Sequence, residues 1–151
     1  MEKLSIVVCV YNEEENIAPL TEQVYKAMEG YNFELVFVDD GSKDNTIKEI
    51  LKFNRKEIHL VELRKNYGQS SALAAGIDYA SGDYIVTIDG DLQNDPSDIP
   101  AMLKMLKDED LDLVAGIRKN RQDGMFLRKI PSKIANLIIR MTTDVRMKDY
   151  G

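Results

Sequence analysis

Short runs of apolar residues alternate along the chain with longer segments whose apolar residues recur at helical spacing. Two of the runs, Leu4–Val10 and Leu35–Val38, are almost continuous, with Ser5 as the one polar residue, and are rich in β-branched residues, as strands buried on both faces are. Three further runs predict strands over His59–Leu63, Tyr84–Ile88 and Leu113–Ile117. Because strands that alternate with helices form parallel sheets, the pattern predicts an α/β fold with a mostly parallel central sheet.

The segments between these runs predict four helices, near residues 14–29, 44–54, 69–80 and 96–107. The first has Asn12 as a candidate N-cap and contains Pro19, which either delays the start of the helix or kinks it. The last begins with Asp95 as its cap and Pro96 in its first turn.

Polar residues follow three of the predicted strands at the point where each strand ends. The first strand leads into Tyr11-Asn12-Glu13, the second into Asp39-Asp40-Gly41-Ser42 and the fourth into Asp89-Gly90-Asp91. The carboxyl ends of parallel strands meet at one edge of a sheet, where ligands bind, so we expect these acids to collect there. Asp-x-Asp directs two hard oxygen ligands at Mg²⁺ or Mn²⁺, whose shell is completed by water and a substrate's phosphates. Asp and Gly are also ordinary turn residues, so Asp-Gly-Asp alone is weak evidence for a metal site. The presence of Asp39-Asp40 at the same edge of the sheet is what favours one.

Two common phosphate-binding motifs are absent from the sequence. No Gly-x-Gly-x-x-Gly follows the first strand, and no Gly-x-x-x-x-Gly-Lys-Ser/Thr occurs anywhere. A dinucleotide-dependent dehydrogenase and a P-loop ATPase are therefore disfavoured. Asn66-Tyr67-Gly68-Gln69 precedes an Ala-rich helix, and alone it indicates only a turn and a helix start.

Acidic and basic residues are distributed unequally along the 151 residues. Residues 1–116 hold 11 Lys and Arg against 23 Asp and Glu, whereas residues 117–151 hold 9 against 3. A basic segment on an acidic body suggests an anionic partner, a phosphate or a lipid headgroup, although a solvated helix face is the alternative. The overall acidity and the lack of an aromatic and basic platform disfavour nucleic acid. Within the segment Arg128 and Ser132 are four residues apart and share a face if it is helical.

Cysteine and histidine, the other residues with candidate chemical roles, occur once each. The single cysteine, Cys9, excludes a disulfide scaffold and a zinc knuckle and fits a reducing compartment. The single histidine, His59, falls at a strand start and is expected to be structural. No window approaches 18 uninterrupted apolar residues.

Five segments occur together in the order of one enzyme family: Tyr11-Asn12-Glu13, Val38-Asp39-Asp40-Gly41-Ser42, Asn66-Tyr67-Gly68-Gln69, Asp89-Gly90-Asp91-Leu92-Gln93 and Asp149-Tyr150-Gly151. Over essentially its whole length the chain resembles the family 2 glycosyltransferases, and among them the polyprenyl-phosphate group, especially the undecaprenyl-phosphate sugar transferases. Dolichyl-phosphate mannose synthase is a more distant likeness. The implied fold is the GT-A type, a Rossmann-like α/β sandwich.

The resemblance implies roles on the donor side of the reaction. A nucleotide diphosphate sugar would be bound by Tyr11, Glu13, Asp40, Asp89 and Gln93. Of these, Asp40 would hydrogen-bond the base, and Asp89 would help to hold the sugar nucleotide. Asp91 would ligate the Mg²⁺ or Mn²⁺ ion on the diphosphate.

The resemblance also implies an acceptor side. Arg118, Arg128 and Ser132 would receive the phosphate of a polyprenyl phosphate, and Asp89, Asp91, Arg118 and Arg128 would be the catalytic residues. The implied reaction transfers the sugar with inversion, from UDP by analogy with bacterial relatives. Since the second pKa of a phosphomonoester is about 6, the acceptor is mostly dianionic at neutral pH and needs no strong base.

Resemblance further suggests how the chain is organised and where it works. We expect one catalytic domain over 1–151, with 1–116 binding the nucleotide sugar and 117–151 forming the basic acceptor side. Relatives continue beyond the position of Gly151 and usually carry two membrane spans. We therefore expect a C-terminally truncated domain, in the cytoplasm at the membrane surface, that binds its donor but transfers slowly if at all.

Two other classes of protein fit the sequence less well. A phosphoacceptor receiver domain requires an acidic pair after the first strand, where this chain has Tyr11-Asn12-Glu13. A nucleotidyltransferase usually has a Gly-, Arg- or Lys-rich loop there, whereas residues 12–15 would repel a triphosphate. A nucleotide-sugar-binding module without turnover and a family 2 enzyme with a saccharide acceptor stay open as alternatives.

Overall fold

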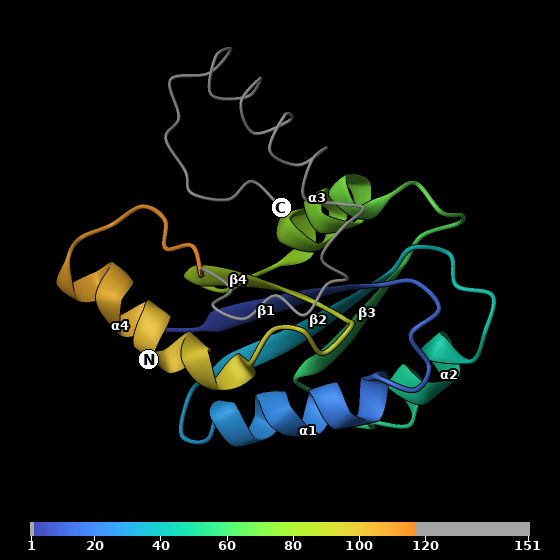
Figure 1. Cartoon of the computed structure of the whole chain (residues 1–151), viewed down its shortest axis with the longest axis horizontal. Coiled ribbons are helices and arrows are strands. Elements are labelled where there is room, and N and C mark those ends of the chain that lie inside the picture. The colour runs from blue at the N-terminus through green and yellow to red at the C-terminus, as the bar shows by residue number, and fades with distance from the viewer. Residues whose placement is uncertain (1, 117–151) are drawn as a thin grey trace, which may run out of the picture. The chain divides into compact units, whose positions relative to one another are not determined.

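A four-stranded sheet forms the centre of the computed structural model, which describes residues 2–116 (Figure 1). Its strands are β1 (Leu4–Val10), β2 (Phe33–Asp39), β3 (Ile58–Glu62) and β4 (Tyr84–Asp89). Their order is β3-β2-β1-β4, and every neighbouring pair is parallel. The α/β fold with a parallel sheet that the sequence predicts is confirmed.

The fifth predicted strand, Leu113–Ile117, is not formed over residues 113–116, and Ile117 lies outside the described residues. A short apolar run is held as a strand only by pairing, and no described strand pairs with residues 113–116. By its contacts the chain divides into two units, residues 1–111 and 112–151.

The four predicted helices are present as α1 (Ile17–Ala27), α2 (Thr46–Leu51), α3 (Gln69–Tyr79) and α4 (Ile99–Asp108), the last preceded by the 3-10 turn η1 (Pro96–Asp98). The carboxylate of Asp95 accepts a hydrogen bond from the Ser97 N–H at 2.9 Å, which confirms it as a cap.

The start of α1 differs from the prediction. The helix begins late, with Pro19 in its first turn, where a missing N–H costs nothing. Asn16, not Asn12, precedes the helix. Asn12 has a φ of 56°, and its side-chain oxygen accepts a hydrogen bond from the Lys43 N–H at 2.8 Å.

Helices cover both faces of the sheet (Figure 1). On one face Ile6 and Val8 of β1 pack with Leu20 of α1, Ile50 of α2 and Ile99 of α4. On the other face α3 packs on Val7, Val36 and Val38. A Cβ at Gly76 of α3 would lie 2.7 Å from Cγ2 of Val38, so the absent side chain lets this helix lie close to the sheet.

The order of the strands locates the ligand-binding edge. From β1 the chain adds β2 and then β3 on one side, and it later returns to add β4 on the other side of β1. In open parallel sheets ligands bind outside the carboxyl ends of the strands at such a reversal. The reversal here lies between β1 and β4.

A buried carboxylate connects the strands near the opposite, amino-terminal edge. Glu34 of β2 is 3% exposed and accepts hydrogen bonds from Nζ of Lys3, from Oγ of Ser5 and from the Ser81 N–H. Burial alone would raise the pKa of Glu34, but these hydrogen bonds outweigh it and lower the pKa to about 2. His59 lies 3.7 Å from the same carboxylate and 3.3 Å from the Tyr79 hydroxyl.

Candidate functional site

Two loops at the carboxyl-terminal edge of the sheet are tied to each other by hydrogen bonds. The N–H of Asn12, after β1, donates to Oγ of Ser42 at 2.9 Å, and the N–H of Glu13 donates to Oγ1 of Thr46 at 2.8 Å. The Glu13 carboxylate accepts a hydrogen bond from the Asn16 side chain at 2.6 Å. Tyr11, at the end of β1, is 39% exposed, so its ring is accessible beside this frame.

Asp39 and Asp40 are buried, and their carboxylates accept hydrogen bonds from backbone N–H groups of the protein. Oδ2 of Asp39 accepts a hydrogen bond from the Ser42 N–H at 2.9 Å, while its Oδ1 has no hydrogen-bond partner among the described residues. The two carboxylate oxygens of Asp40 accept hydrogen bonds from the N–H groups of Tyr67 and Gly68 at 2.7 and 2.9 Å. Asp40 therefore fixes the loop between β3 and α3.

Gly41 strengthens the same attachment. Its φ is +74°, and a Cβ there would lie 2.6 to 2.8 Å from backbone atoms of Lys65 and Asn66. The turn after β2 and the loop before α3 thus pack backbone against backbone, which only a glycine allows.

The Asp-Gly-Asp turn after β4 forms the other half of the edge. The Asp89 N–H donates to the Asn94 side chain at 3.0 Å, and Oδ1 of Asp89 accepts a hydrogen bond from Nε2 of Gln69 at 2.9 Å. Asp91 is exposed and accepts a hydrogen bond from the N–H of Gln93, itself exposed, at 3.1 Å.

Gly90 explains why this turn lies close to β1. A Cβ at Gly90 would lie 2.7 Å from Cγ1 of Val10 and 3.1 Å from the carbonyl oxygen of Cys9. The absence of a side chain therefore lets the turn close against the end of β1, with Asp89 and Asp91 on either side of the glycine.

The acids that end β2 and β4 lie at one edge of the sheet, as expected, but at separate places along it. The two pairs follow strands that are separated by β1, which puts them roughly 10 Å apart at the usual strand spacing. In residues 2–116 no group of three His, Cys, Asp or Glu side chains is arranged to hold a metal ion. Asp89 and Asp91, on either side of Gly90, supply two carboxylates, and one or two carboxylates are what Mg²⁺ or Mn²⁺ uses when phosphates complete its shell. These residues fit the expected ion.

Cys9 lies in β1 between the two acidic pairs. Burial, followed by the charges of Asp89 and Asp40, raises the pKa of its thiol to about 11. The thiol is therefore neutral near pH 7 and contributes bulk rather than reactivity.

Three expected acceptor residues, Arg118, Arg128 and Ser132, lie outside the described residues. Conversely, the structure adds Gln69 and Asn94, which hold Asp89 and were given no role from the sequence. The signal for Gln69 was its place in Asn66-Tyr67-Gly68-Gln69, but its partner is 20 residues away.

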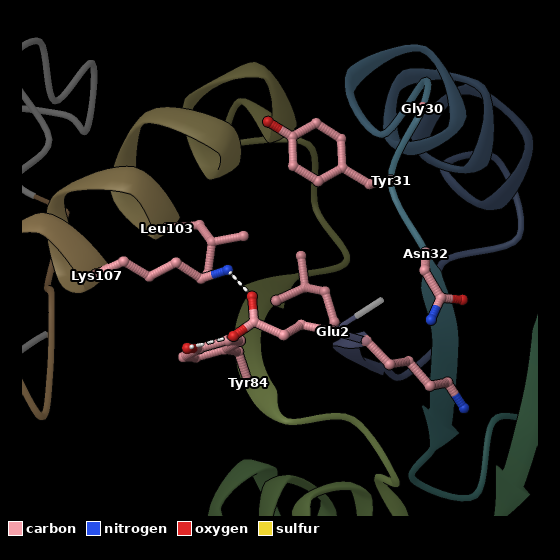
Figure 2. Close-up of a pocket in the computed structure, with 9 residues that line it drawn as sticks. Glu2, Gly30, Tyr31, Asn32, Tyr84, Leu103 and Lys107 are labelled. Carbon is pink, nitrogen blue, oxygen red and sulfur yellow. Dashed lines mark hydrogen bonds and ion pairs between the residues drawn. The ribbon is translucent and has the colours of Figure 1, made fainter.

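A pocket of about 230 Å³ opens at the opposite edge, beside Leu4 of β1, Tyr84 of β4 and Leu103 of α4 (Figure 2). Glu2 forms an ion pair with Lys107 there and accepts a hydrogen bond from the Tyr84 hydroxyl at 3.3 Å. None of the expected site residues lines this pocket.

A parallel sheet with a strand-order reversal and ordered loops at its carboxyl-terminal edge defines an open α/β domain of the class that binds ligands at this edge. The particular family follows from the sequence match. The chain belongs to glycosyl transferase family 2, whose model matches residues 5–151.

Two curated relatives match the chain from end to end. The dodecaprenyl-phosphate galacturonate synthase of Rhizobium johnstonii is 51% identical over 99% of this chain and 46% of its own length. The undecaprenyl-phosphate 4-deoxy-4-formamido-L-arabinose transferase of Salmonella paratyphi B is 42% identical over 100% of this chain and 47% of its own length. The chain thus spans about half the length of these relatives.

Solved structures agree on the fold. The mannosyltransferase PcManGT of Pyrobaculum calidifontis, in complex with GDP-Man and Mn²⁺, has a TM-score of 0.61 and 26% identity over 70% of this chain and 32% of its own. S. aureus TarS 1-349, in complex with UDP-GlcNAc, has a TM-score of 0.63 over 84% of this chain and 38% of its own, and at 21% identity it shows the fold alone. The GT-A type of α/β fold is confirmed. In the described part of the chain no helix has both the length and the apolar character needed to cross a membrane.

Proposed function

We propose that this chain binds the nucleotide sugar in a metal-dependent, inverting transfer of a sugar to a polyprenyl phosphate. The proposal is supported most directly by the end-to-end similarity to two proteins whose names describe polyprenyl-phosphate sugar products or acceptors. The name of the 51% identical relative makes galacturonate the first sugar to test. The donor nucleotide is UDP in this proposal.

The donor would lie at the reversal between β1 and β4. Tyr11 offers an exposed ring for the nucleoside, next to Glu13, while Asp40 reaches the base in addition to its loop contacts. Asp91 would ligate a Mg²⁺ or Mn²⁺ ion, which would neutralise charge on the leaving diphosphate, and Asp89 would help to hold the sugar nucleotide. The backbone N–H of Gln93 donates a hydrogen bond to the Asp91 carboxylate, so Gln93 lies next to the metal ligand.

On the acceptor side, Arg118, Arg128 and Ser132 are assigned the lipid phosphate. Their cationic and hydroxyl groups would offset repulsion between a phosphate nucleophile and an anionic donor. Because the acceptor is a lipid, we place the reaction at the cytoplasmic face of a membrane, with the basic segment 117–151 facing the headgroups.

Calorimetric titration with UDP, and separately with GDP, tests the donor part of this proposal. We expect UDP to bind wild-type chain in the presence of Mn²⁺ and at least about tenfold more weakly without it, because phosphate and metal share the site. Asp91→Ala should remove the effect of Mn²⁺. Asp78→Ala, at an exposed acid on α3, is the matched control and should bind as the wild type does.

Metal-independent binding, or equal binding by the Asp91 and Asp78 variants, would contradict the proposal. Transfer is tested separately with dodecaprenyl phosphate and UDP-galacturonate. Metal-dependent binding without any transfer would favour the binding-module alternative.

A further inference from the structure

Positive charge is concentrated on one stretch of an otherwise acidic body. Residues 1–116 hold 11 Lys and Arg against 23 Asp and Glu, yet residues 48–56 alone hold 4 of these bases and 1 of these acids. The four cations, all of them exposed, are Lys48, Lys52, Arg55 and Lys56. An anionic surface is therefore attracted to this stretch, the α2 patch, and repelled by most of the remaining body.

Two lysines of the α2 patch carry charge that no described acid neutralises. Lys48 donates a hydrogen bond at 3.0 Å to the side chain of Asn45, which is uncharged. Lys56 forms no ion pair with any residue that the structure describes. Lys52 is paired with Glu49 at 2.6 Å, but an exposed pair contributes little in water, so this cation can also turn to another anion.

A leucine projects from the middle of the α2 patch. Leu51, the last residue of α2, is 64% exposed, whereas the preceding Ile50 is 1% exposed and packs in the core. Lys48 lies three residues before Leu51, which places the two side chains on one face of the helix. A single exposed leucine is ordinary at a protein surface, and its place among four cations is what distinguishes this one.

The backbone that carries the α2 patch is fixed at both ends. At its start, Oγ1 of Thr46 accepts a hydrogen bond from the Glu13 N–H at 2.8 Å. At its end, the guanidinium of Arg55 lies 4.3 Å from the centre of the Tyr25 ring, and the Tyr25 hydroxyl donates to the half-buried Glu57 at 3.5 Å. The surface is therefore preformed, and little chain order has to be gained when a partner binds.

Cations around an exposed leucine fit a partner that has an anionic outer layer and an apolar layer beneath it. A bilayer of anionic lipids has both, since its headgroups attract Lys and Arg and its acyl chains bury apolar side chains. Nucleic acid offers phosphates without an apolar layer and would leave Leu51 exposed. A specific protein interface takes about 20–30 residues on each side, more than the α2 patch provides.

We propose that the α2 patch, residues 48–56, docks on an anionic membrane surface, with Leu51 among the acyl chains and the four cations at the headgroups. The inference goes beyond the proposed function, because neither a nucleotide nor a metal takes part in the contact. Thr46 connects α2 to the loop after β1, so docking holds the carboxyl-terminal edge of the sheet near the lipid.

The first test locates the contact within the full chain. The sequence contains no tryptophan, so one introduced tryptophan reports on one position. Leu51→Trp is compared with Ile77→Trp, which is 41% exposed on α3, the helix on the opposite face of the sheet (Figure 1). Vesicles contain equal parts of phosphatidylglycerol and phosphatidylcholine with brominated acyl chains, which quench tryptophan. We expect the emission of Leu51→Trp to be blue-shifted and quenched, and that of Ile77→Trp to be unchanged.

The second test measures affinity by co-sedimentation with the same vesicles. Since the segment 117–151 is also basic, variants of equal net charge are compared. The double variant Lys48→Gln with Lys56→Gln should bind about tenfold more weakly than the wild type. Its control, Lys26→Gln with Lys104→Gln, removes two exposed charges elsewhere and should change binding less than about twofold.

The third test removes the apolar part of the contact. Leu51→Gln should weaken vesicle binding about tenfold, whereas Ile77→Gln should leave it unchanged. Both positions are exposed, so both variants should fold, which circular dichroism checks. Their affinity for UDP with Mn²⁺ should equal that of the wild type.

Each outcome decides for or against the contact. Equal binding to phosphatidylcholine alone, no binding to anionic vesicles, or equal quenching at positions 51 and 77 overturns the proposal. Binding without quenching at position 51 also overturns it, and an emission shift with duplex DNA instead would assign the α2 patch to nucleic acid. A chain that binds UDP but does not dock refutes this inference alone, and one that docks but does not bind UDP refutes the proposed function alone.

Discussion

Nζ of Lys3 lies 2.5 Å from Oε2 of Glu34, so the residue before β1 is joined to the interior of β2. The Glu34 side chain is 4% exposed, and Ser5 and Ser81 donate to its other oxygen at 2.6 and 2.7 Å. One carboxylate therefore connects β1, β2 and the turn between α3 and β4, at the edge opposite the candidate site.

Replacing this carboxylate should destabilise the protein. In Glu34→Gln an amide N–H₂ faces groups that are themselves donors, so at least one buried hydrogen bond is lost. We expect the free energy of unfolding, measured by urea denaturation, to fall by about 2–3 kcal/mol. Glu49→Gln, which removes an exposed ion pair with Lys52, is the control and should cost less than about 0.5 kcal/mol. Equal losses in the two variants would show that Glu34 does not connect the strands energetically.

Stability should also depend on pH through Glu34. Its pKa is about 2 in the folded protein against 4.5 for an unperturbed glutamate, so folding favours the charged form. The stabilisation is complete above pH 4.5 and is lost as the pH falls from about 4.5 toward 2. The difference in unfolding free energy between wild type and Glu34→Gln should shrink over that window and stay constant above it. A difference independent of pH throughout would contradict the assignment.

Gly41 and Gly30 provide a matched pair for the attachment of the loop before α3. Both have positive φ, +74° and +82°, but a Cβ at Gly41 meets the Lys65–Asn66 backbone, whereas a Cβ at Gly30 meets nothing within 4 Å. Gly30→Ala should cost about 1 kcal/mol of unfolding free energy, from backbone strain alone. Gly41→Ala should cost about 3 kcal/mol, because the loop must also move. Similar losses of unfolding free energy at the two positions would mean that the loop before α3 moves away from Gly41 at no energetic cost.

Cys9 should be slow to alkylate in the folded chain. Its pKa of about 11, against 9.0 without the protein environment, lowers the fraction of reactive thiolate near pH 8 by about 100-fold. Iodoacetamide labelling followed by mass spectrometry should therefore be at least that much slower in buffer than in urea. Asp89→Asn removes one of the charges that raise this pKa and should speed the reaction in buffer.

Local patterns in the sequence were sufficient for most of the fold. The β-branched run predicted at Leu35–Val38 lies within β2, and the Asp95 cap is present, because both depend on neighbouring residues. The strand expected at Leu113–Ile117 required a pairing partner that the run itself does not reveal. Asn12 looked like a helix cap but contacts Lys43, which is 31 residues away.

The site was predicted less completely for the same reason. Local reasoning placed the acids at the correct edge of the sheet, but it gave Asp40 a ligand contact alone and no role inside the protein. The structure shows that Asp40 serves a backbone segment 27 residues further on, so its carboxylate is partly used before any ligand arrives. Burial and long-range hydrogen bonding decide which of several similar carboxylates is available, and neither is visible in a short motif.

The pairing of β4 with β1 has a consequence for the order of folding. Leu4 of β1 pairs with Tyr84 of β4, 80 positions further along the chain, whereas the β1–β2 and β2–β3 pairs join strands that are closer in sequence. Since closing a longer loop costs more chain entropy, contacts of high sequence separation form slowly. During synthesis the three-strand unit with Asp40 can assemble first, and the half of the site that contains Asp89 is added only when the growing chain returns to the free edge of β1.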